Sequence, residues 1–358
     1  MSQLVFPLQA VRLAMRREVE ATLVGASAVA GSGAGAGAGA GGAATGRAGG
    51  GRGAGGVVTT RSRRPAGSAR HDEDFTGPPG DLGLFGPASV TWQVHGDLPS
   101  MLVGGVAALL LQTLHPLAMA GVVDHSAYRT DPLGRLRRTA GFVAVTTFGA
   151  TPAVDRAIDQ VRAVHRRVRG VAPDGRPYDA SDPDLITWVH TAEVWCFLRA
   201  YRRFGPAPLG RVAADRYVGE MAVLPRRLGA TQVPETVADV VQYFRDVRAE
   251  LTAGAQALSG AAFIVNSGGQ ALPPAPAMTA AARAVLVQAA IGVVPGWASR
   301  MLGLRRPLLA ERLARRAAAE ALTGTLRWVV GPSPVAAAAR ERCQCRPDLS
   351  LVPADGAA

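Results

Sequence analysis

Lysine is absent from this chain of 358 residues, so arginine supplies all 39 of its basic side chains. The absence excludes several mechanisms within the chain, because a Walker-type phosphate loop, a Schiff-base enzyme and a Ser–Lys dyad all need a lysine amine. The high content of Ala and Gly indicates a GC-rich genome as the source of this bias, rather than selection for arginine chemistry.

Cysteine is also scarce, and its three residues are too few for a disulfide framework. Cys196 stands in an apolar helical segment, where a free thiol acts as a small core residue. Cys343 and Cys345 form a C-x-C pair, but two thiolates make at most half of a zinc site. We expect this pair to lie in a flexible C-terminal tail, residues 336–358.

Acidic residues are outnumbered, and the formal net charge is +12. A strongly basic balance is typical of proteins that bind nucleic acid. Residues 1–70, however, hold nine Arg and two acidic residues and so carry about +7 of the total. The rest of the chain mixes both signs, and we expect it to have no nucleic-acid partner.

Large side chains are missing from residues 31–56, where 14 of 26 residues are Gly. Such a segment cannot build a core and is typical of a flexible linker. In a secretory signal, positive charges precede the apolar segment. Here Arg12, Arg16 and Arg17 follow the first apolar residues, so this order is not found. We expect a cytoplasmic protein with a disordered Gly/Ala-rich extension over residues 1–75 and one folded domain over residues 76–335.

The most apolar uncharged run covers residues 101–123, and its 23 positions are long enough to span a bilayer. It contains Gln112, His115 and Pro116, which are unusual in a lipid-facing helix. We therefore expect a buried core helix that ends near Pro116 and continues after a kink. A membrane-spanning segment, or a helix that docks on a membrane surface, is the alternative.

Alternation with period two is rare, so strands should be minor. Asp131-Pro132 and Thr151-Pro152 are typical helix starts, with a capping side chain followed by proline in the first turn. They predict helices over about 132–148 and 152–170. A further helix starts near residue 183, and helices follow around 209–229, 235–257, 277–293, 297–304 and 306–322. The fold class predicted by these patterns is all-α.

Three polar residues share one side of the helix predicted over 132–148, since Arg135, Arg138 and Thr139 are three and four positions apart. The next helix returns antiparallel after a short connection. At ~1.5 Å per residue, Thr139 lies ~16 Å and His165 ~22 Å from that connection. Arg135, Thr139 and His165 can therefore face one slot between the two helices.

The chemistry of these side chains suits a haem, although each has a simpler interpretation. Imidazole ligates haem iron, Arg pairs with carboxylates such as haem propionates, and a Thr hydroxyl can donate to a ligand. A single helical His is more often a surface or core residue, and the arginines can equally form a solvated face. Spacing alone leaves both interpretations open.

A family resemblance favours the haem. From about Gly86 to Leu228 the sequence resembles the family that shares the catalytic domain of rubber oxygenase (latex-clearing protein) and the MpaB-type oxygenases. The matching motifs are FGP at 85–87, TWQVH at 91–95, LLLQTLHP at 109–116, DHS at 124–126, DPLGRLRRT at 131–139, VHRRVRG at 164–170 and WVH at 188–190.

The resemblance implies a fold, a cofactor and a set of site residues. In the rubber-oxygenase branch the domain is all-helical, has a globin-like core and binds haem b. Carried onto this sequence, the resemblance implies that His165 is the axial ligand of the iron. It implies that Arg135 and Thr139 bind the haem and are needed for activity.

The sequence departs from that branch at two points. A distal Lys beside the Thr is replaced by Arg138, whose guanidinium does not readily ligate iron but can donate a hydrogen bond to bound dioxygen. That branch also uses a Glu base one helix earlier, and no Glu occurs between Gly77 and Glu193. His125 is our candidate for the distal catalytic group, with Asp124 as the other substitute.

Two functions of different class follow. The first is a haem-b-dependent oxygenase that activates dioxygen to oxidise a small apolar substrate. The second is a non-catalytic haem or small-ligand binding protein, such as a sensor or carrier, which the replacement by Arg138 favours. A di-metal site at His190 and Glu193 would need further carboxylates, and His95 and His115 are expected to be structural.

Overall fold

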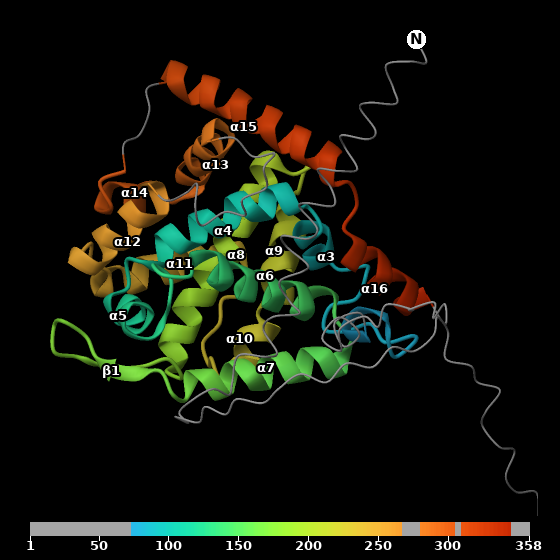
Figure 1. Ribbon diagram of the computed structural model, residues 1–358, viewed down its shortest axis with the longest axis horizontal. Helices are drawn as coiled ribbons and strands as arrows, with labels where there is room; N and C mark the ends of the chain where they lie inside the picture. The colour runs from blue at the N-terminus through green and yellow to red at the C-terminus, as the bar shows by residue number, and fades with distance from the viewer. Residues whose placement is uncertain (1–72, 267–279, 305–308, 345–358) are drawn as a thin grey trace, which may run out of the picture.

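The structure, a computed structural model, describes residues 73–266, 280–304 and 309–344 (Figure 1). Within these ranges the chain is mostly helical, which confirms the predicted all-α class. The extension predicted to be disordered, residues 1–75, lies outside the described residues except for its last three.

The helices and strands are named in chain order. The helices are α3 (Val90–His95), α4 (Leu98–Gln112), α5 (Pro116–His125), α6 (Pro132–Phe148), α7 (Thr151–His165), α8 (Pro183–Phe204), α9 (Arg211–Met221), α10 (Val223–Leu228), α11 (Val237–Asp246), the 3-10 helix η1 (Val247–Glu250), α12 (Ala255–Asn266), α13 (Ala280–Val293), α14 (Gly296–Met301), α15 (Leu309–Val330) and α16 (Pro334–Gln344). Between α7 and α8, strands β1 (Arg169–Val171) and β2 (Pro177–Asp179) form an antiparallel hairpin. The described residues contain no other strand, as the rarity of period-two alternation predicts.

The core is built on the packing of α4 against α8, which is the most extensive helix pair among the described residues. Gly104 makes this approach possible, because a Cβ at this position would lie 2.7 Å from Cδ1 of Phe197 and 3.0 Å from its Cα. Most of α4 is buried, and α12, α13 and α15 also contact it. The resulting hydrophobic core lies in the centre of the molecule (Figure 1).

An ion pair ties the first turn of α4 to the long helix α15. Asp97 caps α4 by accepting a hydrogen bond from the Ser100 backbone N–H. Its carboxylate also accepts from Nε and Nη2 of Arg327, at 2.7 and 2.9 Å, and Arg327 donates further to the Phe204 carbonyl at 2.7 Å. Asp97 is buried, so the bidentate pairing compensates a charge that would otherwise destabilise the fold.

The apolar run 101–123 forms two helices, α4 and α5, which are bent by 106° relative to each other. His115 caps α5 and Pro116 begins it, so the predicted kink at this proline is confirmed. Among the described residues, no single helix is both long and apolar enough to cross a bilayer, and α4 and α5 meet the criterion only as this bent pair.

The helix predicted over 152–170 is shorter than expected. Helix α7 ends at His165, and residues 169–171 instead form β1, because Arg169 pairs with Asp179 across the hairpin. Thr151 is the first residue of α7 rather than its cap, since its N–H and hydroxyl both donate to the carboxylate of Asp81.

Helix α16 crosses the domain boundary predicted at residue 335. It lies beside the rest of the described chain up to Gln344 (Figure 1), and its Arg342 is buried. The Arg342 guanidinium donates to the carbonyls of Phe75, Asp81 and Phe148 at 2.9–3.0 Å. These bonds join the C-terminal helix to the first described residues and to the end of α6. Of the C-x-C pair, Cys343 lies on α16, and Cys345 lies outside the described residues.

The Gly104 contact gives a matched test of helix packing. We expect Gly104→Ala to lower the free energy of unfolding by about 2 kcal/mol, because the new methyl group overlaps Phe197. At Gly105 a Cβ would lie 3.8 Å from Phe197, so Gly105→Ala should be neutral or stabilising by up to about 1 kcal/mol. Urea unfolding of both variants measures the difference, and equal effects would show that α4 and α8 do not meet this closely.

Candidate functional site

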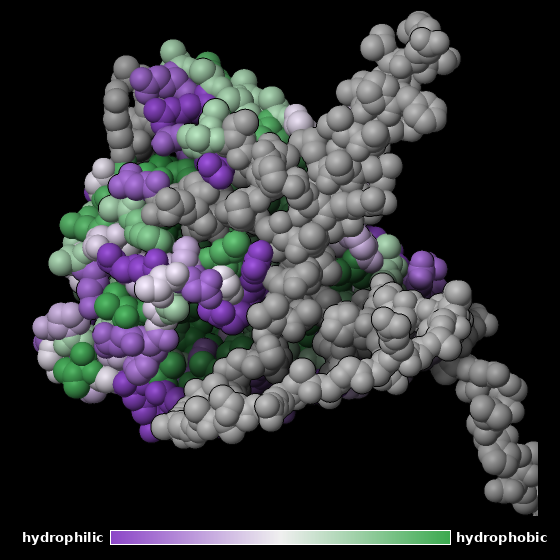
Figure 2. All heavy atoms as spheres, viewed as in Figure 1, coloured by the Kyte–Doolittle hydropathy of each residue, from purple (hydrophilic) through white to green (hydrophobic). Residues whose placement is uncertain are grey.

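Helix α6 is less completely packed than the core helices. Every residue from Pro132 to Val145 is at least partly exposed, although the segment includes Leu136, Phe142 and Val143. Asp131 caps the helix as predicted, by accepting a hydrogen bond from the Gly134 N–H. Figure 2 shows hydrophobic and hydrophilic residues side by side on this face of the molecule. Partly exposed apolar side chains that gather on one helix are typical of a ligand site.

Arg135 is half-buried on this helix, and burial lowers its pKa. Its Nη1 donates to the hydroxyl of Ser126 at 2.8 Å. Among the described residues, no carboxylate lies within ion-pair distance of Arg135, and the Nε of Arg137 is buried without a hydrogen-bond partner. The first half of α6 therefore carries two guanidinium groups that an anionic ligand would stabilise.

Thr139 and Arg138 are exposed on α6. The Thr139 hydroxyl donates to the carbonyl of Arg135 at 3.2 Å, which is the local bond that a helical Thr commonly makes. Arg138 pairs with Asp131 at 3.4 Å. Both pairings are solvent-accessible, and an exposed ion pair of this kind is easily opened by a competing ligand.

His165 is the last residue of α7 and is half-buried. Its Nδ1 is buried and has no hydrogen-bond partner among the described residues. Burial lowers the pKa of His165, and the negative charge of Asp179 opposes this shift. The imidazole is therefore held neutral at physiological pH, the form in which it ligates a metal.

The connection between α6 and α7 is two residues long, shorter than expected, and this changes the register of the site. Arg135 stands 13 residues before the end of α6, about 20 Å along its axis, and His165 stands 14 residues after the start of α7, about 21 Å along. Thr139 is only about 14 Å from the end of α6 by the same rise. Along their own helices, His165 and Arg135 therefore lie at nearly equal distances from the connection, and Thr139 lies more than one turn nearer to it.

An apolar cluster lies between α6 and α7 at the end of the pair near their connection. Val154 and Ile158 of α7 pack against Leu224 of α10, and Phe142 of α6 joins them. The two helices are therefore joined by hydrophobic contacts at one end, and the polar residues Arg135 and His165 stand at the other end of the pair.

His125 lies at the end of α5, exposed, and is bonded to the hairpin. Its Nε2 is 3.1 Å from both the Tyr178 hydroxyl and the Arg169 carbonyl. Tyr178 donates its proton to Asp124 at 2.5 Å, so Nε2 of His125 must be the donor to both oxygens. The two distal candidates of the sequence, Asp124 and His125, are thus brought together at the hairpin.

His95 and His115 are both buried, as expected of structural histidines. The ring of His95 is bonded to the hydroxyls of Thr147 and Tyr217, at 2.7 and 3.0 Å. Nδ1 of His115 caps α5, and its Nε2 lies 3.7 Å from a carboxylate oxygen of Glu250.

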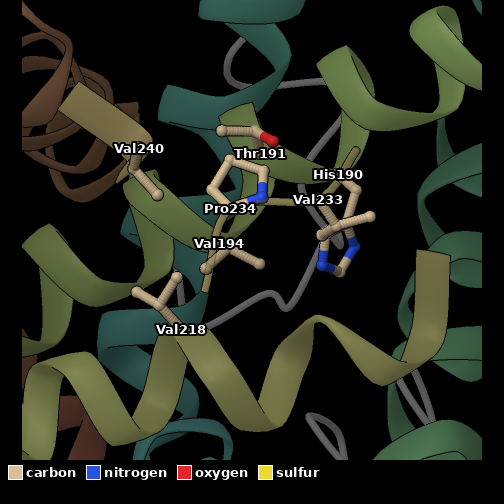
Figure 3. A pocket seen from close by; sticks show the side chains of 7 residues that line it. All are labelled: His190, Thr191, Val194, Val218, Val233, Pro234 and Val240. Carbon is tan, nitrogen blue, oxygen red and sulfur yellow. The ribbon is translucent and has the colours of Figure 1, made fainter. Parts of the chain in front are cut away.

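His190 and Glu193 lie on α8, and neither is part of a metal-binding cluster in the described part of the chain. The described residues contain no group of three or more His, Cys, Asp or Glu that could hold a metal ion. Nε2 of His190 and Oγ1 of Thr191 are buried without partners. Both residues line a cavity of about 10 Å³, with Val194, Val218, Val233, Pro234 and Val240 (Figure 3). A cavity of this size holds about one water molecule, which excludes it as the site of a haem.

Three residues that lie next to the candidate side chains in space or in sequence were not assigned a role from the sequence. Ser126 bonds Arg135, and Tyr178 and Asp179 lie on the hairpin that follows His165. Ser126 belongs to the DHS motif, which was the available signal. The roles of Tyr178 and Asp179 depend on strand pairing, which gives no local signal in the sequence.

The buried histidines predict a loss of stability in acid. Burial lowers the pKa of His95 to about 3 and of His115 and His190 to about 4, with the charge of His190 adding to the effect on His95. Unfolded His binds a proton below pH 6.5, whereas these three residues stay neutral in the folded protein, so each of them lowers the free energy of unfolding as the pH falls from 6.5 towards 4.

Glu193 has the opposite effect, because burial raises its pKa to about 7. The folded state then gains stability as the pH falls from 7 to about 4.5. We expect urea unfolding to show a net loss of stability between pH 6.5 and 4.5, and a steeper loss in Glu193→Gln. A free energy of unfolding that is constant over this range would show that the histidines are not held neutral.

Comparison with known proteins places the chain in a family. Residues 92–328 match the family described as the catalytic domain of ER-bound oxygenase mpaB/B' and rubber oxygenase. Two curated relatives, the uncharacterised proteins Mb2261 of Mycobacterium bovis and Rv2237 of Mycobacterium tuberculosis, are each 34% identical over 116 residues. The aligned part is 32% of this chain and 43% of each relative, so the chain spans less than half of their length. No solved structure matches.

The family match covers more than half of the chain and includes α6, α7, the hairpin and α8. The family predicted from the sequence motifs is therefore confirmed. The chain belongs to the family of ER-bound oxygenase mpaB/B' and rubber oxygenase catalytic domains.

Proposed function

We propose that this protein is a haem-b-dependent oxygenase that activates dioxygen to oxidise a small apolar substrate. Membership of an oxygenase family supports an oxidoreductase function. The haem, the site residues and the substrate class are our proposal. The globin-like arrangement of the helices, which the resemblance implies, stays a prediction.

One observation carries the proposal: Arg135 and His165 lie at nearly equal distances from the connection between the consecutive helices α6 and α7. The guanidinium lacks a carboxylate partner and the imidazole has a buried nitrogen without a partner, both among the described residues. A haem carries carboxylates and an iron, the two groups that these side chains bind best. The residues present therefore fit the cofactor.

Each residue has a defined role in this proposal. His165 would ligate the iron through Nε2, since Nδ1 is the buried nitrogen. Arg135, fixed by Ser126, would bind a propionate. Thr139 and Arg138 lie one turn further along α6, where their hydroxyl and guanidinium could donate hydrogen bonds to dioxygen. When bound, haem b supplies the redox chemistry of dioxygen.

The apolar side chains of α6 favour an apolar substrate. Leu136, Phe142 and Val143 are only partly buried, so they are available to contact a hydrocarbon chain. Hydrophobic walls also exclude water, which protects reactive oxygen species from side reactions.

A haem carrier or sensor is the second candidate function. It is favoured by the ion pair of Arg138 with Asp131, because a guanidinium that stays protonated cannot act as the base of an oxygenase. The bonding of His125 to the hairpin also engages the other candidate base. Oxygen consumption by the ferrous protein, measured with and without apolar substrates such as terpenes, distinguishes the two functions.

The first test of the proposal is haem binding by the full chain. We expect the purified protein, reconstituted with haem b, to show a Soret band. His165→Ala should shift or abolish that band, and added imidazole should restore it, because free imidazole can occupy the space of the missing ring. A folded wild-type protein without a Soret band would contradict the proposal, and so would a His165→Ala spectrum identical to the wild type.

A second variant tests the propionate partner. We expect Arg135→Ala to weaken haem affinity by about tenfold, which corresponds to the loss of one charge-assisted pairing. Arg162→Ala is the matched control, since Arg162 is exposed on α7. Haem transfer to apomyoglobin measures both. Equal affinities in the two variants would exclude Arg135 from the haem site.

A further inference from the structure

The β1–β2 hairpin extends beyond the packed helices (Figure 1), and one of its faces is closed against α5. Tyr178 of β2 is 5% exposed, and its hydroxyl is bonded to Asp124 and His125 at the end of α5. Gly170 stands opposite Tyr178 in the strand register, and a Cβ there would overlap the tyrosine ring. These contacts fix the position of the hairpin and determine which of its faces points outward.

The outward face of the hairpin carries apolar side chains beside a guanidinium. Arg169 and Val171 stand on either side of Gly170 along β1, so their side chains point away from α5. Val171 is 65% exposed, and Pro177, its partner across the strands, is exposed as well. Arg169 pairs with Asp179 but keeps 61% of its side chain exposed.

The turn between α7 and β1 adds two more arginines. Arg166 and Arg167 are exposed there, and Val164, in the last turn of α7, is 48% exposed. Neither arginine forms an ion pair among the described residues, in contrast to the paired arginines of α7 and the hairpin. Arg167 uses only its Nε, which donates to the Ala163 carbonyl at 3.2 Å. The charge of both guanidinium groups is therefore open to a partner.

The turn and the hairpin form one basic region. The His165 carbonyl accepts a hydrogen bond from the Val168 N–H at 3.0 Å, and the Val168 carbonyl accepts one from the Ala180 N–H at 2.9 Å. Residues 161–180 hold five Arg and two Asp, a net charge of +3, whereas residues 71–358 as a whole carry only +5. We call Val164, Arg166, Arg167, Arg169 and Val171 the basic edge.

We propose that the basic edge docks on a membrane surface that contains anionic lipids. Arginines pair with lipid phosphates, and exposed apolar side chains between them lose contact with water when they enter the headgroup region. A nucleic acid would attract the same charges, but its phosphate backbone offers the two valines no apolar surface. The basic edge is distinct from the apolar run 101–123, since most of α4 is buried in the core.

Vesicle binding by the full chain tests the inference. The vesicles contain either phosphatidylcholine alone or equal parts of phosphatidylcholine and phosphatidylglycerol, and flotation at physiological salt measures the bound fraction. We expect binding to the anionic vesicles only. Arg166→Gln/Arg167→Gln should weaken this binding by roughly 25-fold, about fivefold for each arginine near the surface. Arg166→Lys/Arg167→Lys should keep most of it, because the charge is retained.

Two matched controls separate the basic edge from charge and exposure in general. Arg202→Gln/Arg203→Gln removes the same charge from exposed residues in the last turn of α8, about 30 Å along that helix from its start near the hairpin. It should bind like the wild type, because salt screens charges at that distance. Val171→Ser should weaken binding severalfold, whereas Val212→Ser, at an 84% exposed position on α9, should not.

The outcomes decide between a lipid surface and its alternatives. Loss of binding in Arg166→Gln/Arg167→Gln and in Val171→Ser, with both controls like the wild type, supports the inference. Equal binding by the two arginine double variants would overturn it, and so would a wild type that does not float with anionic vesicles. A loss of affinity for duplex DNA without a loss of affinity for vesicles would assign the arginines to nucleic acid and overturn it as well.

Circular dichroism and the thermal midpoint show whether each variant is folded. If Arg166→Gln/Arg167→Gln does not fold, the comparison of Val171→Ser with Val212→Ser decides, and equal binding by these two variants would overturn the inference. None of these measurements involves haem, so the failure of this inference would leave the proposed function intact.

Discussion

Helices α4 and α8 can approach closely because Gly104 presents no side chain where it meets Phe197. The other helices are arranged around this pair: α12, α13 and α15 cover α4, and α3, α9 and α10 contact α8. The ion pair of Asp97 with Arg327 secures α15 against the start of α4. A buried hydrophobic centre of this kind allows the periphery to be packed less completely, because the core supplies most of the burial on which stability depends.

Helix α6 lies in that periphery, and its incomplete packing explains why the candidate site is there. Arg342 fixes the end of α6 through the Phe148 carbonyl, and the apolar cluster with Leu224 joins it to α7. The opposite end carries Arg135 without a carboxylate partner among the described residues. Partly exposed apolar side chains beside a guanidinium without a carboxylate partner among the described residues are the features of α6 that make it the candidate ligand surface.

Local chemistry explains which features could be predicted from the sequence. The start of α6 at Asp131-Pro132 and the kink at Pro116 depend on capping and on a missing N–H, which neighbouring residues determine. The end of α7 at His165 depends on the pairing of β1 with β2, which begins twelve residues after His165, and the burial of Arg342 depends on carbonyls from distant segments. At the site, spacing predicted that Arg135, Thr139 and His165 share a slot; the two-residue connection instead leaves Thr139 more than one turn nearer the connection than the other two. Contacts between distant segments, such as that of His125 with the hairpin, had no local signal.

The haem that we propose between α6 and α7 depends on His165 as the ligand of its iron. A crystal structure of the haem-loaded protein would test this directly. We expect an iron bonded to Nε2 of His165, with a propionate at Arg135. A haem bound elsewhere, or an iron bonded to a different histidine, would show that the proposed site is wrong.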